Sequence, residues 1–208
     1  MDSTRPETRP SAFWTLPLEI RELIYNFHLQ STPHLDRGSP PSEPPLTLAC
    51  KQIRREALPL YYSAYKLHVQ TFIRSSYHRQ IWLRTEHWYH GIAPAKFKQI
   101  RHFQLNFALI DPYTGERVPV EFHVDLPKRD GCFTIRQSFA RSWIRNPHRI
   151  GDPADFDDLI VVLRDHLDGV LSTISKQGRI VEGLSAEDVD RLVKIDPDSL
   201  PLFTQIQS

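Results

Sequence analysis

The stretch "RHFQLNFAL", residues 101–109, alternates apolar and polar side chains along its whole length. Phe103, Leu105 and Phe107 fall on one side of an extended chain, because successive side chains of a strand point to opposite faces. An apolar face of this kind has to be covered by other parts of the protein. The pattern therefore predicts a strand in a sheet that has one buried face.

Two further stretches repeat this alternation, "VPVEFHVDL" at 118–126 and "CFTIRQSF" at 132–139. The connections "DPYTG" and "PKRDG" have the residues and the length of hairpin loops. We expect an antiparallel β-meander from about residue 100 to 139, with residues 67–73 as a candidate neighbouring strand. Pro119 has no N–H to donate, so it is tolerated only at a sheet edge or at a strand start.

A long helix is predicted after these strands, over residues 153–177. Its apolar stripe should cover the buried face of the sheet, and consists of Phe156, Ile160, Leu163, Leu167, Leu171 and Ile174. Gly178 suits the end of this helix. One more short helix should follow, with Ser185 as its N-terminal cap.

Helices are also predicted in the first half of the chain. The first should run over Pro17–Leu29 and the second over about 46–57, where Pro59 should end or kink it. A proline-rich loop separates the two. A third helix is expected over residues 76–90, from an apolar stripe made of Tyr77, Ile81 and Trp88.

The composition indicates a soluble globular protein that acts in the cytoplasm or nucleus. The chain has 208 residues, of which 40% are hydrophobic and 25% are charged, and it lacks an apolar run long enough to span a bilayer. Its two cysteines are not arranged as a C-x-x-C pair, which fits a reducing compartment. We expect no membrane association.

Few residues suggest chemistry. The glycine-rich phosphate loops, the nucleophile elbow and the H-E-x-x-H zinc helix are all missing, so we expect a protein with no catalytic residues and no cofactor. His87 and His90 in "EHWYH" are three residues apart and could face one ligand from a helix. Two imidazoles with Glu86 are fewer ligands than a specific site needs unless distant ligands join them. We therefore predict no metal site from the sequence.

Nucleic-acid binding is a weaker alternative. Arg141 and Arg145 in "ARSWIRNPHR" stand four residues apart and could contact phosphates. The formal net charge is only +1, and the region after residue 151 is acidic, which disfavours a uniform nucleic-acid-binding surface. A solvated arginine face is the simpler interpretation.

Residues 14–25, "WTLPLEIRELIY", raise the main functional question. An apolar stripe follows this segment at helical spacing and consists of Leu16, Ile20, Leu23, Ile24 and Phe27. Polar residues fill the other side of the helix, namely Glu19, Arg21, Glu22 and Asn26. An apolar stripe must be covered. The cover is either the protein's own core or another protein.

The same segment carries a resemblance to a known family. "LPLEIRELIY", a proline-rich gap and "LACKQIRREALPLYYSAYKLHV" resemble the pattern of the fungal F-box-like family, over residues 13–73. In that family the F-box is a small helical module that binds a Skp-type adaptor and so joins a cullin-based ubiquitin ligase. The rest of the chain selects a substrate protein.

The resemblance implies a set of partner-binding residues. Leu16 and Pro17 would open the edge that faces the adaptor, with Ile20 and Ile24 behind them. The second helix would contribute Leu48, Cys50 and Ile53. By this reading the chain is a non-catalytic adaptor that recruits a substrate protein to the ligase.

The predicted architecture is α+β. An N-terminal helical F-box-like segment is packed beside the antiparallel meander, which the long C-terminal helix covers. We expect a disordered leader at 1–12, the F-box-like segment at 13–73 and an α+β region at 74–208 that forms one compact unit with it. Two alternatives stay open: an F-box-like α+β domain with an unrelated interaction role, and an enzyme or nucleic-acid binder.

Overall fold

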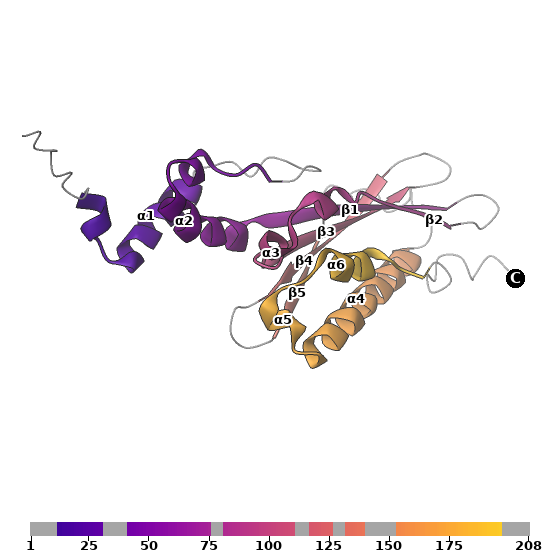
Figure 1. Cartoon of the computed structure of the whole chain (residues 1–208). Coiled ribbons are helices and arrows are strands. Elements are labelled where there is room, and N and C mark those ends of the chain that lie inside the picture. The colour runs from indigo at the N-terminus through magenta and orange to yellow at the C-terminus, as the bar shows by residue number, and fades with distance from the viewer. Residues whose placement is uncertain are drawn as a thin grey trace, which may run out of the picture. The chain divides into compact units, whose positions relative to one another are not determined.

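The computed structural model describes residues 12–30, 41–75, 81–110, 117–126, 132–139 and 153–196, and it has an α+β fold (Figure 1). The chain divides into two compact units. The N-terminal unit consists of Met1–Pro33 with Ser42–Tyr61, and the C-terminal unit of His34–Pro41 with Tyr62–Ser208. The two units divide between Tyr61 and Tyr62, whereas the predicted F-box-like segment extends to residue 73. The strand that begins at Lys66 therefore belongs to the C-terminal unit.

The N-terminal unit is helical in the part that the structure describes. A 3₁₀ helix, η1, spans Ala12–Thr15 and leads into helix α1, Leu18–Gln30. A second 3₁₀ helix, η2, spans Pro45–Leu48 and precedes helix α2, Lys51–Ala64. Glu19 lies in the first turn of α1, where a carboxylate is favourable at the positive end of the helix dipole.

The prediction that Pro59 ends or kinks the second helix is wrong about the end. Pro59 lies inside α2, which continues to Ala64. A proline in a helix interior costs about 3 kcal/mol. Its ring is on the exposed side of the helix, whereas Ala57, Tyr61 and Tyr62 are buried. Burial of these side chains outweighs the local cost.

The C-terminal unit is built on a five-stranded sheet in the order β2-β1-β3-β4-β5. Its strands are β1 (Lys66–Ser75), β2 (Ile81–Thr85), β3 (His102–Ile110), β4 (Arg117–Asp125) and β5 (Thr134–Phe139). The predicted meander is present as β3, β4 and β5, which pair antiparallel. The predicted neighbour is β1, and it runs parallel to β3 with Leu67 opposite Phe103. The sheet is therefore mixed.

The helix predicted over residues 76–90 is wrong for the described part of that range. Residues 81–85 form β2, and a 3₁₀ helix, η3, spans Trp88–Gly91. Strand β2 pairs antiparallel with β1, and the hydroxyl groups of Thr71 and Thr85 lie 3.1 Å apart. A short run of apolar residues is compatible with both a helix and a strand. Pairing with β1 therefore determines that residues 81–85 form a strand.

Pro119 lies in β4 opposite Ala108 of β3. The described pairing between β4 and β5 starts one residue later, with Val120 opposite Phe139. Within the described residues, Pro119 thus has a strand neighbour on one side only.

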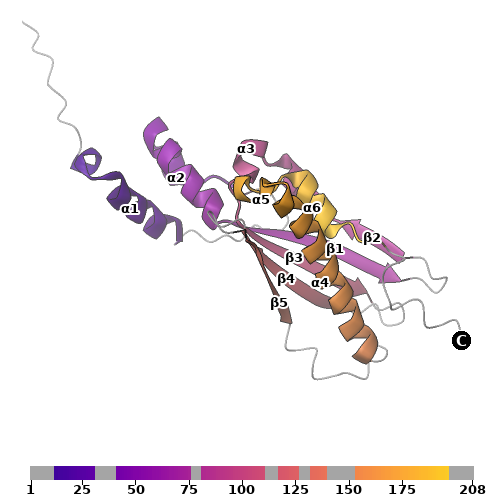
Figure 2. The same ribbon diagram turned by 90° about the horizontal axis from the view of Figure 1, so that it is seen from below.

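One face of the sheet is covered by helix α4, Pro153–Lys176 (Figures 1 and 2). Buried side chains from the sheet include Phe103, Leu105, Phe107, Phe122 and Val124, and those from α4 include Leu159, Leu163, Leu167, Leu171 and Ile174. Gln104 and Asn106 alternate with the buried residues of β3 and are partly exposed. The sheet therefore has one buried face and one partly solvated face.

Short helices complete this unit: α3 (Pro94–Phe97), α5 (Arg179–Glu182) and α6 (Ala186–Val193). Ser185 caps α6 as predicted, because its hydroxyl accepts from the Asp188 N–H while Asp188 accepts from the Ser185 N–H. Gly178 follows α4 with a φ of 71°, in the left-handed region that suits glycine. None of the helices among the described residues is long and apolar enough to cross a bilayer.

Candidate functional site

Helix α1 leaves its apolar stripe uncovered. Five side chains are exposed, which we call the α1 apolar surface: Leu18, Ile20, Leu23, Ile24 and Phe27. Leu23 is 64% exposed and Phe27 is 81% exposed. Single apolar residues on a protein surface are ordinary, but a contiguous apolar patch on one helix is typical of a binding surface.

The side of α1 that is buried includes residues predicted to be the polar side. Tyr25 and Leu29 are buried, and the Arg21 side chain is only 12% exposed. The Arg21 guanidinium donates to both carboxylate oxygens of Glu56 on α2, at 3.0 Å from Nε and 2.9 Å from Nη2. Arg21, which the sequence places on the polar side of this helix, is therefore mostly buried. The bidentate ion pair with Glu56 holds the side of α1 that carries Arg21 against α2.

Glu56 is the centre of a polar network between the two helices. Tyr25 Oη donates to it at 2.9 Å and Gln52 Nε2 donates at 3.0 Å. The hydrogen bond from Arg21 is the main cause that lowers the pKa of Glu56 to about 2. Burial, followed by the hydrogen bond to Glu56, raises the pKa of Tyr25 to about 12. The network therefore holds an ionised carboxylate at neutral pH.

Arg21 also fixes the start of α1. Its Nη1 donates to the Leu16 carbonyl at 2.7 Å, and its guanidinium lies 5.7 Å from the centre of the Trp14 ring. The ring of Phe13 packs against Tyr25 at a centroid distance of 5.9 Å. Through Arg21, the turn that carries Leu16 and Pro17 is thus connected to both helices by one partly buried side chain.

All seven residues predicted to bind a partner lie in the N-terminal unit. On α1 and the turn before it, Leu16 is half-buried, while Pro17, Ile20 and Ile24 are exposed. Around the start of α2, Leu48 is 68% exposed, Cys50 is an exposed thiol and Ile53 is half-buried. The prediction missed Leu18, and it gave Leu23 and Phe27 no binding role, although their helical spacing was visible.

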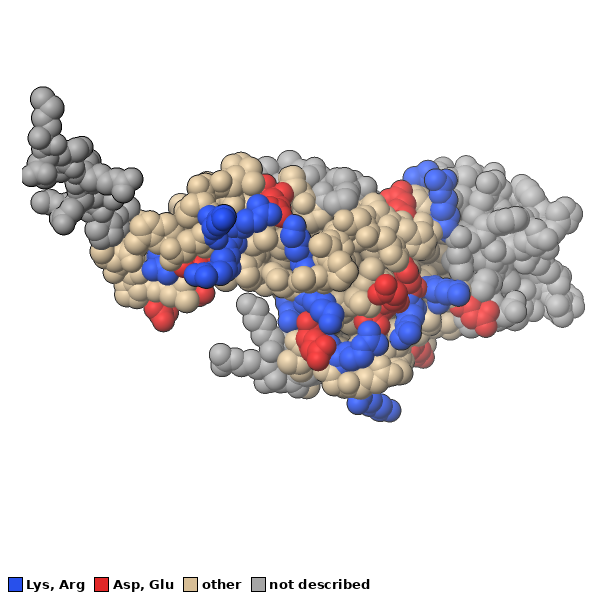
Figure 3. Space-filling model, viewed as in Figure 1, with Lys and Arg blue, Asp and Glu red and all other residues tan. Residues whose placement is uncertain are grey.

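The arginines suggested for nucleic acid, Arg141 and Arg145, lie outside the described residues. On the face shown in Figure 3, basic side chains gather over the N-terminal unit, whereas basic and acidic side chains are interspersed over the coloured part of the C-terminal unit. A phosphate backbone is normally met by a continuous basic surface, and this face of the described C-terminal unit does not show one.

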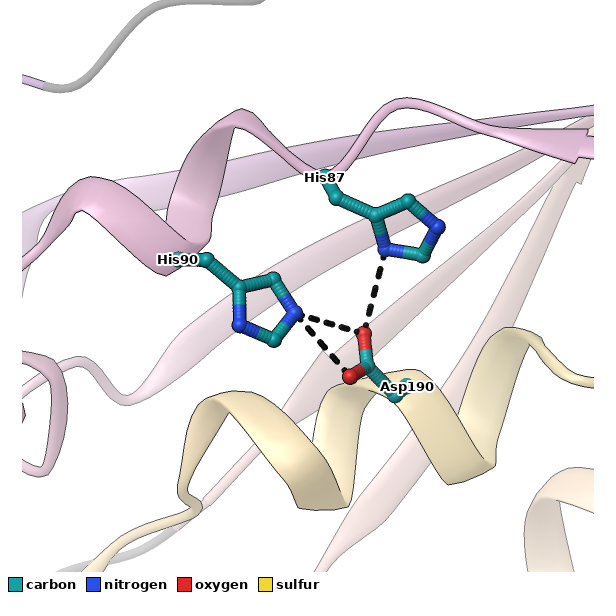
Figure 4. Close-up of side chains that lie close together, drawn as sticks. All are labelled: His87, His90 and Asp190. Carbon is teal, nitrogen blue, oxygen red and sulfur yellow. Dashed lines mark hydrogen bonds and ion pairs between the residues drawn. The ribbon is translucent and has the colours of Figure 1, made fainter.

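A second cluster joins residues that are far apart in the sequence. His87 precedes η3, His90 lies in η3, and both face Asp190 of α6 (Figure 4). His87 Nδ1 lies 3.3 Å from Asp190 Oδ1, and His90 Nε2 lies 2.9 Å from Oδ2. We call this group the His–Asp cluster. The three-residue spacing of His87 and His90 is visible in the sequence, but no local sequence pattern connects them to Asp190.

Tyr89 holds the carboxylate of this cluster in place. Its hydroxyl donates to Asp190 Oδ1 at 2.6 Å, and its side chain is buried. Burial, followed by the hydrogen bond to Asp190, raises the pKa of Tyr89 above its ordinary value. Burial by itself opposes ionisation of Asp190, but hydrogen bonds from Tyr89 and His90 outweigh it and lower the pKa of Asp190. Asp190 is therefore an anion that faces two imidazoles.

The described residues thus present two candidate sites, the α1 apolar surface and the His–Asp cluster. Comparison of the chain with protein-family models, curated proteins and solved structures finds no match.

Proposed function

We propose that this chain is a non-catalytic interaction protein whose N-terminal unit binds a Skp-type adaptor and so recruits another protein to a cullin-based ubiquitin ligase. The observation that supports the proposal is the α1 apolar surface. Five large apolar side chains are exposed on a helix of 13 residues. An exposed patch of this kind is typical of a surface that a partner covers.

The residues of the F-box-like pattern divide into two groups. The polar ones, Arg21, Tyr25 and Glu56, connect α1 to α2 inside the unit. The apolar ones on α1, Ile20 and Ile24, remain exposed. In a protein-binding module, one set of residues has to hold the two helices together while another set stays exposed for the partner. The division therefore favours a binding role for the apolar group.

Covering the α1 apolar surface would contribute favourable free energy to binding. Removing one Leu, Ile or Phe side chain from water is worth about 1.5–3 kcal/mol. Part of this gain is lost to the cost of association, so a few central side chains carry most of the affinity. Substitution of one or two residues on α1 should therefore weaken binding by tenfold or more.

The C-terminal unit is assigned the second half of the role, binding of the protein that is to be ubiquitylated. Such ligases work in the cytoplasm and nucleus, where we place the chain. An interaction with a different partner through the same α1 surface is the remaining alternative, and it depends on the same observation.

Co-purification with a recombinant Skp-type adaptor tests the proposal. The wild-type chain should retain the adaptor, and the double variant Leu16→Ala with Pro17→Ala should lose it. Circular dichroism should show that the variant keeps its helices, because neither side chain is buried.

A matched control is Val161→Ala, which changes an exposed apolar residue of α4 in the C-terminal unit. This variant should bind like the wild type. Retention of the adaptor by the Leu16 and Pro17 variant would contradict the proposal that the turn before α1 forms the edge that faces the adaptor. Failure of the wild-type chain to bind the adaptor would favour the alternative partner.

A further inference from the structure

We propose that His87, His90 and Asp190 form a binding site for a divalent transition-metal ion of the zinc class. This site lies entirely in the C-terminal unit and is separate from the α1 apolar surface. Among the described residues, these three form a group in which a nitrogen or oxygen of each lies within 4.8 Å of the others. The group joins η3 to α6, about 100 positions further along the chain.

The distances suit a tetrahedral ion. Zinc binds imidazole nitrogen and carboxylate oxygen at about 2.0–2.2 Å, which places neighbouring ligand atoms of a tetrahedron about 3.3 Å apart. His87 Nδ1 and Asp190 Oδ1 are 3.3 Å apart. His90 Nε2 lies 2.9 Å from Asp190 Oδ2. These two distances involve different oxygens of Asp190. One ligand atom of each of the three residues lies within 4.8 Å of the others, so rotation of the side chains would bring one nitrogen of each imidazole and one carboxylate oxygen to the same ion.

The carboxylate is oriented before any ion arrives. Tyr89 Oη donates to Asp190 Oδ1 at 2.6 Å, so the oxygen that would coordinate is Oδ2, which lies 2.9 Å from His90 Nε2 and would exchange that contact for the ion. Tyr89 itself is buried, so its hydroxyl has little freedom to move away. Hydrogen bonds of this kind to a ligating carboxylate orient it and typically change metal affinity by about 10–100-fold.

The ligand types select the class of metal. Two imidazoles and one carboxylate suit Zn²⁺, Cu²⁺ or Ni²⁺, whereas Mg²⁺ and Ca²⁺ prefer ligand sets made of oxygen. The side chains of His87, His90 and Asp190 are 56%, 42% and 33% exposed. An ion can therefore enter from solvent, and water can occupy the remaining coordination position.

An ion at this position would link two segments that are distant in sequence. It would coordinate residues in and next to η3, which follows β2, and a residue of α6, the last helix of the described chain. Binding to the folded chain alone raises its stability by mass action. Zn²⁺ should accordingly raise the melting temperature of the C-terminal unit, and a chelator should reverse the change.

Calorimetric titration of the full chain with ZnCl₂ tests the proposal. The wild type should bind one Zn²⁺ tightly, and binding should weaken at acidic pH because protonated imidazole cannot coordinate. His90→Ala and Asp190→Asn should each reduce the affinity at least tenfold. Tyr89→Phe removes only the orienting hydroxyl and should weaken binding about tenfold.

The matched control is His102→Ala. His102 also pairs with a carboxylate, because its Nδ1 lies 2.7 Å from Asp125 Oδ1, but the other oxygen of Asp125 forms an ion pair with the Arg136 guanidinium. This variant should bind Zn²⁺ like the wild type. Unchanged binding by His90→Ala and Asp190→Asn, or no binding by the wild type, would overturn the proposal.

A second measurement identifies the ligands in the wild-type chain, and it decides the matter even where a variant fails to fold. X-ray absorption at the zinc edge of the Zn²⁺-loaded protein should show two imidazole ligands with oxygen and no sulfur. A shell with sulfur, or with a single imidazole, would place the ion elsewhere and refute the site.

Discussion

The two units of the chain use apolar and polar residues in opposite ways. In the C-terminal unit, the apolar face of the sheet and the apolar stripe of α4 are buried, and Phe107 and Leu167 have no exposed surface. In the N-terminal unit, Arg21 and Glu56 connect α1 to α2, while most of the apolar stripe of α1 is exposed. One unit is stabilised by an apolar core, and the other depends heavily on a polar network.

This difference shows that an apolar stripe alone does not identify the buried side of a helix. On α4 the stripe residues whose burial the structure describes, from Ile160 to Ile174, all lie on the buried side. On α1 the buried side follows Arg21 and Tyr25, which are fixed by Glu56 on the neighbouring helix. Because the apolar stripe of α1 is exposed, another protein can bind to it, whereas the stripe of α4 is occupied by the protein's own core.

The largest expected effect comes from the core of the C-terminal unit. Phe107→Ala should lower the free energy of unfolding of that unit by about 3–5 kcal/mol, because it leaves a cavity beneath α4. Phe27→Ala on α1 should change stability by no more than about 0.5 kcal/mol, since its side chain is 81% exposed. Urea denaturation of both variants measures the difference. Similar losses in the two variants would break the comparison.

An intermediate effect is expected from the polar network. Glu56→Gln keeps the size of the side chain but removes the charge that accepts from Arg21, and hydrogen bonds to charged groups are worth about 2 kcal/mol. We expect the free energy of unfolding of the N-terminal unit to fall by about this amount. Glu19→Gln is the control: it removes only the favourable interaction of a carboxylate with the α1 dipole, which is worth about 0.3–1 kcal/mol. Equal costs would show that the network is dispensable.

The smallest and most specific effect is a dependence on pH. The pKa of Glu56 is lowered from 4.5 to about 2 in the folded chain, mainly by the hydrogen bond from Arg21. A lowered carboxylate pKa gives stability that is complete above the ordinary value and is lost as the pH falls towards the folded value. The stability difference between wild type and Glu56→Gln should thus shrink between pH 4.5 and pH 2. A constant difference over that range would contradict the account of Glu56.

Much of the fold could be predicted from local sequence patterns. The alternation of Phe103, Leu105 and Phe107 predicts β3, and the turn residues after it predict the meander. Ser185 predicts the start of α6, where the capping box is found. In each case the physical cause lies within a few residues of the signal, so one sequence suffices to detect it.

The features that escaped prediction depend on residues distant in sequence. Strand β2 exists because β1 offers it a pairing partner, and Pro59 is tolerated because buried side chains flank it. Arg21 turns inward because Glu56 lies 35 residues further on. His87 and His90 likewise meet Asp190 only in the folded chain, about 100 positions further on. A local hydrophobic pattern carries no information about such long-range pairs.

The central claim is that the α1 apolar surface is where the adaptor binds. Titration of a purified Skp-type adaptor with wild type, Leu23→Glu and Val161→Glu tests it most directly, because both substitutions place a charge at an exposed apolar position. The account predicts that Leu23→Glu weakens binding at least tenfold and that Val161→Glu binds like the wild type. Equal affinity of all three chains would contradict it.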